Sequence, residues 1–185
     1  MDPIAVMTME NGAEIVIELL PGHAPNTVAS FIHLAKLGVF DGHAIERIVP
    51  GKWVDASYRA FHREEAKYLI PRESELHPEI EPLDSHPGCI CMGGYKAGLA
   101  GGEFFFPLKD CPEHKGVYPV FGKILSGMDE ILRLEKVETV PVEGLGMEVN
   151  CPKEPQIIKR VTVDTFGEEY PMPVTVDAPR PKNWE

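Results

Sequence analysis

The chain has 185 residues, enough for one domain that buries its own hydrophobic core. Hydrophobic residues make up 43% of it and charged residues 25%, as in ordinary globular proteins. The net charge of -11 argues against nucleic-acid binding, which needs clustered Lys and Arg, and no apolar run is long enough to span a bilayer. We therefore expect one globular domain that binds neither nucleic acid nor membrane.

The cysteine content and the N-terminus indicate a compartment. The first residues show no basic stretch followed by an apolar one, so we expect no signal peptide. The four cysteines, Cys89, Cys91, Cys111 and Cys151, do not resemble the dense framework of a small secreted domain. We expect a cytoplasmic protein, and a secreted protein that has lost its leader is the alternative.

The first third of the chain predicts a hairpin, a helix and two short strands. Asn11-Gly12 suits the tight turn of a β-hairpin because both residues tolerate positive φ. Pro25 opens a predicted helix whose apolar residues recur every three or four positions, and Gly38 is its expected stop. The strands predicted in this part are 4–9, 14–20, 44–49 and 52–56.

The remainder predicts a long loop, more strands and a second helix. Residues 59–87 hold many charges and several prolines, as in a surface loop. The glycine-rich stretch 93–102 has no side chains for a core, and its backbone can approach a ligand closely. Ser126, followed by an acid at position 129, predicts a helix that runs to about Glu135. The strands predicted here are 88–92, 103–107, 119–125 and 157–164.

These elements together favour one architecture. Seven or eight short strands, only two helices and no regular alternation of strand and helix predict a closed all-β barrel. We assign residues 1–167 to this barrel domain and 168–185 to a proline-rich tail. The tail, with Trp184, is expected either to pack on the barrel as an arm or to be disordered. The pattern alone predicts no function.

Two cysteine–histidine patterns raise a metal-site hypothesis. They are His86-x-x-Cys89-x-Cys91 and Cys111-x-x-His114. Zinc sites usually combine two closely spaced pairs such as C-x-x-C. Cys89 and Cys91 instead lie on one face of a predicted strand, where small buried cysteines are common. We expect no metal and no cofactor.

Six segments carry recognisable motifs: 18–21 (E-L-L-P), 24–28 (A-P-N-T-V), 68–73 (Y-L-I-P-R-E), 104–105 (F-F), 120–123 (V-F-G-K) and 127–129 (G-M-D). They resemble those of cyclophilin-type peptidyl-prolyl cis-trans isomerases and follow the order that the family has. The similarity extends over residues 4–166, and the segment 68–73 is similar to that of bacterial members. The resemblance implies a closed, eight-stranded antiparallel barrel capped by two helices. It also implies a monomer that isomerises X-Pro bonds in proline-containing polypeptides.

The resemblance also implies which residues form the site. The family signature F-H-R-x-I-P-G-F-M-x-Q-G-G-D falls on residues 45–58, where Arg47, Pro50 and Gly51 are kept. Arg47 takes the place of the catalytic arginine. The residues that take substrate-binding positions are Trp53, Asp55, Met92, Gly93, Gly94, Glu103, Phe105, Glu113, His114 and Tyr118.

Several of these positions depart from the family pattern. Asp55 and Glu103 stand where Gln is usual, and Gly94 replaces an Asn that binds substrate backbone. Glu113 takes the position of a Trp that contacts cyclosporin in some members, and Lys52 replaces an aromatic residue of the proline pocket. We therefore expect a slow isomerase. The alternative is a cyclophilin-fold module that binds peptides or proteins with little or no isomerase activity, and a scaffold with another interaction surface is a third interpretation.

Overall fold

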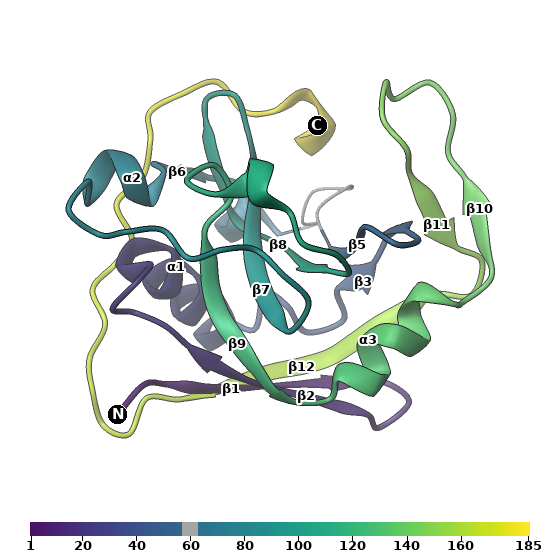
Figure 1. Ribbon diagram of the computed structural model, residues 1–185, viewed down its shortest axis with the longest axis horizontal. Helices are drawn as coiled ribbons and strands as arrows, with labels where there is room; N and C mark the ends of the chain where they lie inside the picture. The colour runs from purple at the N-terminus through teal and green to yellow at the C-terminus, as the bar shows by residue number, and fades with distance from the viewer. Residues whose placement is uncertain (57–62) are drawn as a thin grey trace.

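A path of antiparallel strands curves around a hydrophobic core in the computed structural model, which describes residues 1–56 and 63–185 (Figure 1). The α-helices are α1 (Pro25–Lys36), α2 (Glu73–Leu76) and α3 (Met128–Glu135). The strands are β1 (Ile4–Met9), β2 (Glu14–Leu19), β3 (Ala44–Ile45), β4 (Arg47–Val49), β5 (Trp53–Asp55), β6 (Leu69–Ile70), β7 (Cys89–Tyr95), β8 (Gly98–Pro107), β9 (Val120–Ser126), β10 (Thr139–Pro141), β11 (Asn150–Pro152) and β12 (Gln156–Asp164).

The predicted closed, eight-stranded barrel with two helices is wrong in its details. The strands follow the order β10-β11-β4-β5-β8-β7-β9-β2-β1-β12-β3, with β6 beside β8, and in the described part of the chain no pairing joins the two ends of this path. The sheet has twelve strands, and α2 is a third helix. The extra strands and α2 are two to four residues long, too short to leave a periodic pattern in the sequence.

The longer predicted elements are confirmed. The first hairpin turns at Asn11-Gly12, where Gly12 has a φ of 88°. The helix predicted to end near Glu135 does end there, but its N-cap is Gly127 rather than Ser126, and no side chain caps it. Gly127 has a φ of 95°, and a Cβ on it would lie 2.3 Å from the carbonyl oxygen of Glu14. Only glycine fits this junction between β9 and α3.

A cluster of phenylalanines forms the centre of the core. The ring centroid of Phe31, on α1, lies 5.0 Å from that of Phe40, 6.0 Å from Phe104 and 5.3 Å from Phe121. Each fully buried ring contributes about 1.5–3 kcal/mol through the removal of apolar surface from water. Phe104 faces this core. Because side chains alternate along a strand, Phe105 projects from the opposite face of β8.

Part of the predicted surface loop is ordered by a buried carboxylate. Helix α1 has no side-chain cap from its own N-terminal residues. Instead, Glu73 accepts hydrogen bonds from the backbone N–H (2.6 Å) and the hydroxyl (2.8 Å) of Thr27. A negative charge at a helix N-terminus is favourable, although burial raises the pKa of Glu73. The loop that carries the 68–73 motif is thereby fixed to α1, whereas residues 57–62, part of the predicted signature and loop, lie outside the described residues.

The glycine-rich stretch forms a hairpin between β7 and β8. A Cβ on Gly94 would lie 2.6 Å from the Cα of Leu99, so the glycine allows close approach of its own neighbouring strand. A Cβ on Gly101 would lie 2.4 Å from the ring of Tyr68. The glycines therefore serve the packing of this hairpin, whatever they contribute to a ligand.

The C-terminal tail, residues 168–185, packs as an arm against α1 and β6. The side chain of Asn26 donates to the carbonyl of Val174 (3.0 Å) and accepts from its N–H (2.7 Å). Val176 bridges to Leu69, and Trp184 is only 3% exposed. The arm is the arrangement that the structure shows, while the division of domains at residue 167 stays a prediction.

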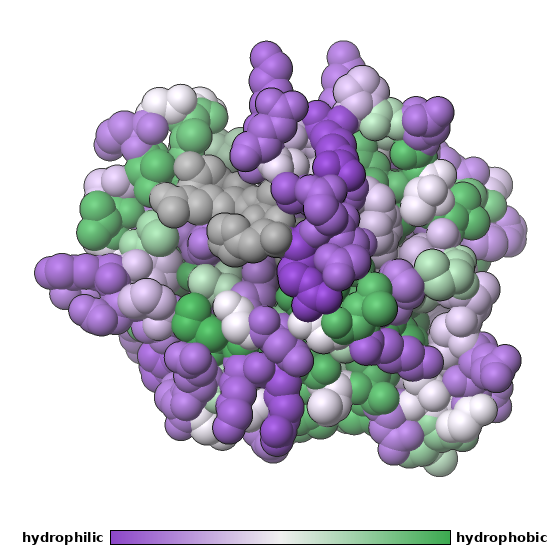
Figure 2. All heavy atoms as spheres, turned by 180° about the vertical axis from the view of Figure 1, so that it is seen from behind, coloured by the Kyte–Doolittle hydropathy of each residue, from purple (hydrophilic) through white to green (hydrophobic). Residues whose placement is uncertain are grey.

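The surface away from these contacts is largely hydrophilic. Figure 2 shows the face opposite to that of Figure 1, where hydrophilic side chains project and hydrophobic residues are scattered between them, in keeping with the net charge of -11. Among the described residues, no helix combines the length and the apolar character that a membrane crossing requires.

Candidate active site

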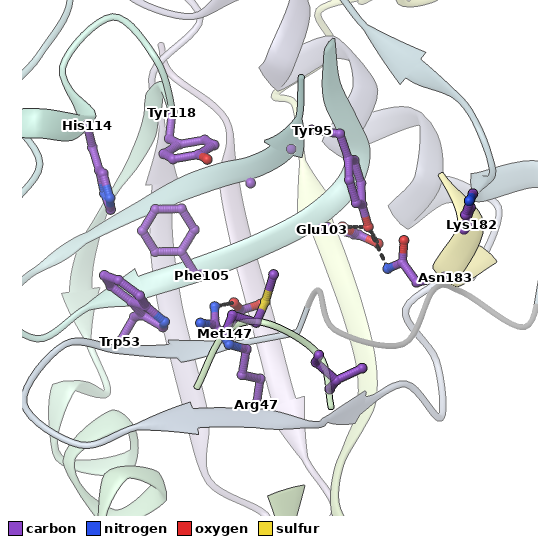
Figure 3. A pocket seen from close by; sticks show the side chains of 14 residues that line it. Arg47, Trp53, Tyr95, Glu103, Phe105, His114, Tyr118, Met147, Lys182 and Asn183 are labelled. Carbon is purple, nitrogen blue, oxygen red and sulfur yellow. Dashed lines mark hydrogen bonds and ion pairs between the residues drawn. The ribbon is translucent and has the colours of Figure 1, made fainter. Parts of the chain in front are cut away.

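One large cavity, of about 500 Å³, opens between β4, β5, β7 and β8 (Figure 3). It gathers nine of the predicted site residues: Arg47, Trp53, Asp55, Gly93, Gly94, Glu103, Phe105, His114 and Tyr118. It is also lined by five residues that sequence reasoning missed: Tyr95, Leu145, Met147, Lys182 and Asn183. The predicted site residues therefore lie mostly together in one cavity, and the five unpredicted residues come from three segments: the end of β7, the loop between β10 and β11, and the C-terminal turn.

Strand register positions the polar centre of the pocket. Arg47 on β4 lies directly opposite Asp55 on β5, and Asp55 lies opposite Phe105 on β8. Directly opposite residues project from the same face of a sheet. The register thus places a cation, a carboxylate and an aromatic ring in one row across three strands.

Arg47 is held by three kinds of contact. Its Nη1 donates to Oδ2 of Asp55 at 3.0 Å, and its Nε donates to the backbone carbonyl of Glu148 at 2.9 Å. Its Cζ lies 5.4 Å from the centroid of the Trp53 ring, a cation–π distance. The side chains of Arg47 and Asp55 are 14% and 5% exposed. The guanidinium is therefore fixed in orientation, and a nearly buried carboxylate offsets its charge.

Four rings form what we call the aromatic cup: Trp53, Phe105, His114 and Tyr118. The centroids of His114 and Tyr118 are 5.0 Å apart, those of Phe105 and Tyr118 6.1 Å, and those of Trp53 and His114 5.6 Å. Burial lowers the pKa of His114 and favours its neutral ring. The cup offers apolar walls beside Arg47, as a proline ring requires.

Two predicted site residues lie outside the cavity. Met92 pairs with Phe104 across β7 and β8, and its side chain is fully buried in the core. Because side chains alternate along a strand, Met92 faces the core and not the pocket. It does not line the cavity as predicted but lies behind the pocket wall. Glu113 is exposed and lies 3.8 Å from Lys109, at the rim of the turn that carries His114.

Glu103 forms the polar end of the cavity. It accepts hydrogen bonds from the Tyr95 hydroxyl, 2.9 and 2.8 Å from its two oxygens, and from Nε1 of Trp184 at 2.8 Å. Burial raises the pKa of Glu103 to about 8, Asp55 adds to the rise, and the donors Trp184 and Tyr95 offset part of it. Asn183 donates to the Tyr95 hydroxyl at 2.8 Å and extends this network into the tail.

The second cysteine–histidine pattern comes together in space. Candidate ligand atoms of Cys111, Glu113 and His114 lie within 4.8 Å of one another, the one such trio found in the described residues. Burial raises the pKa of the Cys111 thiol, with a smaller contribution from Glu113. Because a metal binds the thiolate, this rise weakens the trio as a metal site at neutral pH. Cys89 and Cys91 are instead buried beside Phe105.

The chain is similar to known proteins over most of its length. Residues 4–163 match the family model for cyclophilin type peptidyl-prolyl cis-trans isomerases. Peptidyl-prolyl cis-trans isomerase B of Bacillus subtilis is 32% identical over 140 residues, which cover 74% of this chain and 95% of that protein. Peptidyl-prolyl cis-trans isomerase-like 1 of Gibberella zeae is 28% identical over 152 residues, 81% of this chain and 89% of that protein.

A solved structure supports the same fold. The crystal structure of a Cryptosporidium parvum cyclophilin, obtained in the presence of the dipeptide Ala-Pro, superposes with a TM-score of 0.68 at 18% identity. The match covers 88% of this chain and 99% of that one. The chain belongs to the cyclophilin-type peptidyl-prolyl cis-trans isomerase family, as its ordered motifs predict.

Proposed function

We propose that this chain catalyses cis-trans isomerisation of X-Pro bonds in polypeptides, with Arg47 as the catalytic residue. One observation carries the proposal: a fixed guanidinium lies at the edge of an aromatic cup in a cavity of about 500 Å³. The cup binds the proline ring, and the hairpin backbone at Gly93 and Gly94 lies along the same cavity, where an extended chain can pair with it.

The chemistry needs a hydrogen-bond donor rather than a proton transfer. Conjugation keeps the peptide bond planar, and rotation faces a barrier of about 18–20 kcal/mol. In the twisted transition state the lone pair is localised on the prolyl nitrogen. A donor aimed at that nitrogen stabilises the twisted form more than either planar isomer, and this difference is what accelerates the reaction.

Arg47 is suited to this task because its orientation is fixed before substrate binds. Nε and Nη1 are engaged by Glu148 and Asp55, and within the described residues Nη2 has no partner. A planar, permanently charged fork can hold two N–H groups in place and present the others to the prolyl nitrogen. Removal of water from the cup strengthens that hydrogen bond.

The Asp55 carboxylate makes slow catalysis part of the proposal. It orients the guanidinium, but its negative charge opposes the positive field at the prolyl nitrogen. The same ion pair favours the second candidate function, a module that binds proline-containing peptides without catalysing their isomerisation. Glu113, at the rim, and Met92, behind the pocket wall, have indirect roles in either function.

We also infer that the protein acts as a cytoplasmic monomer on proline-containing polypeptides, without a cofactor and without binding nucleic acid. The four cysteines are all unpaired, which suits a reducing compartment. The net charge of -11 disfavours binding to phosphate backbones. Size-exclusion chromatography with light scattering tests the monomer directly.

The experiment that separates the two functions is NMR exchange between the cis and trans signals of an Ala-Pro peptide. Without a catalyst this exchange takes tens of seconds. We expect catalytic amounts of the protein to make exchange measurable on the NMR timescale. Peptide signals that shift on binding while exchange stays at its uncatalysed rate would replace the isomerase with the binding module.

A further inference from the structure

The tail end of the pocket, defined here as Tyr95, Glu103, Lys182 and Asn183, is built partly by the last turn of the chain. Lys182–Trp184 forms a 3-10 turn that places Lys182 and Asn183 in the lining of the cavity. Figure 3 shows both residues on the side opposite His114 and Tyr118. The family match ends at residue 163, so Lys182 and Asn183 come from outside the matched segment.

The wall is anchored rather than loosely placed. Trp184 packs with Leu69 and Ala100 in a small hydrophobic cluster, and its indole N–H donates to Glu103. The ring of Tyr95 packs edge-on against it, with centroids 5.8 Å apart. Farther along the tail, Arg180 pairs with Glu64 at 2.9 Å. These contacts hold Lys182 at a defined position beside β7 and β8.

The charges that line the pocket leave one cation unbalanced. Arg47 and Asp55 offset each other at 3.0 Å. Burial raises the pKa of Glu103 to about 8 and lowers that of His114, so at neutral pH both groups favour their uncharged forms. Lys182 lies within 4.0 Å of no carboxylate among the described residues. In a chain of net charge -11, this pocket therefore carries a positive charge.

The opposite rim lines the cavity with apolar side chains. The loop between β10 and β11 contributes Leu145 and Met147 to the lining, and these residues are 38% and 58% exposed. In Figure 1 this loop and the C-terminus rise on either side of the region above β5 and β8. A bound polypeptide thus meets an apolar rim on one side and an ammonium group on the other.

We propose that the tail is a specificity wall, in which Lys182 selects polypeptides that carry Asp or Glu close to the isomerised proline. This inference deepens the proposed function and rests on it. Proline occupies the aromatic cup, the extended chain crosses Gly93 and Gly94, and a carboxylate farther along it meets the ammonium group. A partly exposed pair of this kind is worth about 1 kcal/mol, or about fivefold in kcat/KM.

The test measures charge preference and its reversal. The peptides share an Ala-Pro core. Each carries Glu, Gln or Lys at a single position, within two residues before or after that core. NMR exchange gives kcat/KM for each peptide. At the responsive position we expect the wild type to favour Glu over Lys by about fivefold. Lys182→Glu should reverse the order. Lys159→Glu, an equal charge change at an exposed position of β12 outside the cavity lining, should keep it.

The outcomes separate the wall from the isomerase. Turnover without a charge preference, or a preference that Lys182→Glu leaves intact, overturns the specificity wall. If no peptide is turned over, the proposed function fails, and titration of the same peptides then tests the wall by binding: a preference reversed by Lys182→Glu supports it, and equal binding overturns it. Because Lys182 is exposed and unpaired among the described residues, and Lys159 is also exposed, both variants should keep the wild-type thermal midpoint.

Discussion

The two ends of the pocket are made in different ways. The aromatic cup is held by packing: Trp53 and Phe105 project from paired strands, their ring centroids 6.3 Å apart, and the indole N–H of Trp53 is buried without a partner among the described residues. The tail end is held by a hydrogen-bond network in which Glu103 accepts from Trp184 and Tyr95. One end is therefore held by apolar packing, and the other by polar contacts.

This difference assigns different tasks to the two ends. An apolar cup binds a proline ring without regard to sequence, since all substrates of the proposed reaction carry that ring. A polar wall whose ammonium group pairs with no carboxylate among the described residues should discriminate among the residues on either side of the proline. Variants that damage one end should therefore change catalysis or selectivity and leave the other property in place.

The largest effect on catalysis is expected at the end of the pocket that holds the aromatic cup, Arg47 and Asp55, which we call the catalytic end because the proposed isomerisation takes place there. Arg47→Ala removes the donor to the prolyl nitrogen while the cup remains, so kcat/KM should fall by about hundredfold, as for the loss of one preorganised donor. Arg47→Lys should rescue little, because lysine lacks the rigid fork. Arg160→Ala, which removes an exposed arginine of β12, is the matched control.

Asp55 affects how the Arg47→Ala variant is interpreted, because its carboxylate loses its partner. Removing Arg47 takes away the cation that faces the nearly buried Asp55, so the single variant should also lose stability. The double variant Arg47→Ala/Asp55→Asn removes the carboxylate charge as well. If either folded variant keeps wild-type kcat/KM in the exchange measurement, Arg47 is not the catalytic residue.

The two ends also differ in how far the sequence predicts them. Long elements such as α1 and β12 were predictable because their patterns extend over 12 and 9 residues. Most of the catalytic end followed from ordered motifs. Met92 was misplaced because a motif identifies a position in a strand but does not say which face its side chain takes.

The tail end was predicted only in part: the motifs indicated Glu103, and an arm was one of two expectations for the tail, but the contact between them was not predicted. Trp184 and Glu103, which make its central hydrogen bond, are 81 positions apart. The sequence of the proline-rich tail does not indicate which buried acceptor the Trp184 indole binds. The sequence around Glu103 likewise does not indicate that burial raises its pKa. Such contacts depend on tertiary packing, which local patterns do not encode.

Trp184→Ala should break the tail end alone. Loss of a buried aromatic side chain costs about 3–5 kcal/mol, so the thermal midpoint should fall clearly. Trp53 is then the single remaining tryptophan, and its fluorescence reports on the catalytic end. We expect its emission to match that of Trp184→Phe, which keeps the bulk and loses the N–H donor. A midpoint equal to that of the wild type would mean that the tail is not anchored as described.

The pH dependence of stability tests the polar tail end through Glu103. The pKa of Glu103 is raised from its ordinary 4.5 to about 8, so the folded state keeps a proton that the unfolded state releases. This stabilising contribution is complete below the unfolded pKa and is lost as pH rises through the folded one. Between about pH 5.5 and about pH 7.5 the wild type should lose about 3 kcal/mol on this account, at about 1.4 kcal/mol per unit.

The measurement is the free energy of unfolding at both pH values, with Glu103→Gln as the test variant. Gln does not titrate, so the variant should lose less stability over this interval than the wild type. Glu10→Gln, at an exposed turn position, controls for the loss of one carboxyl group. Equal pH dependence in wild type and Glu103→Gln would show that Glu103 is ionised throughout.

The smallest expected effect concerns the point where the two ends meet. Asp55 pairs with Arg47 on the catalytic side, and its charge also raises the pKa of Glu103 on the other. Two consequences of the Asp55–Arg47 pair oppose each other: it orients the guanidinium, and it weakens the field at the prolyl nitrogen. Because Glu148 and the Trp53 ring also hold Arg47, orientation does not depend on Asp55 alone.

The weakening of the field should therefore outweigh the benefit of orientation, and Asp55→Gln should raise kcat/KM by about tenfold, equivalent to about 1.4 kcal/mol. A neutral amide at this position can still accept from Nη1, so the orientation is kept while the charge goes. The comparison uses one X-Pro peptide and requires equal folding of the two proteins, shown by their circular dichroism spectra. A decrease in kcat/KM would mean that orientation by the carboxylate outweighs its opposing field, and Asp55 would then be a positioning residue that the catalytic end requires.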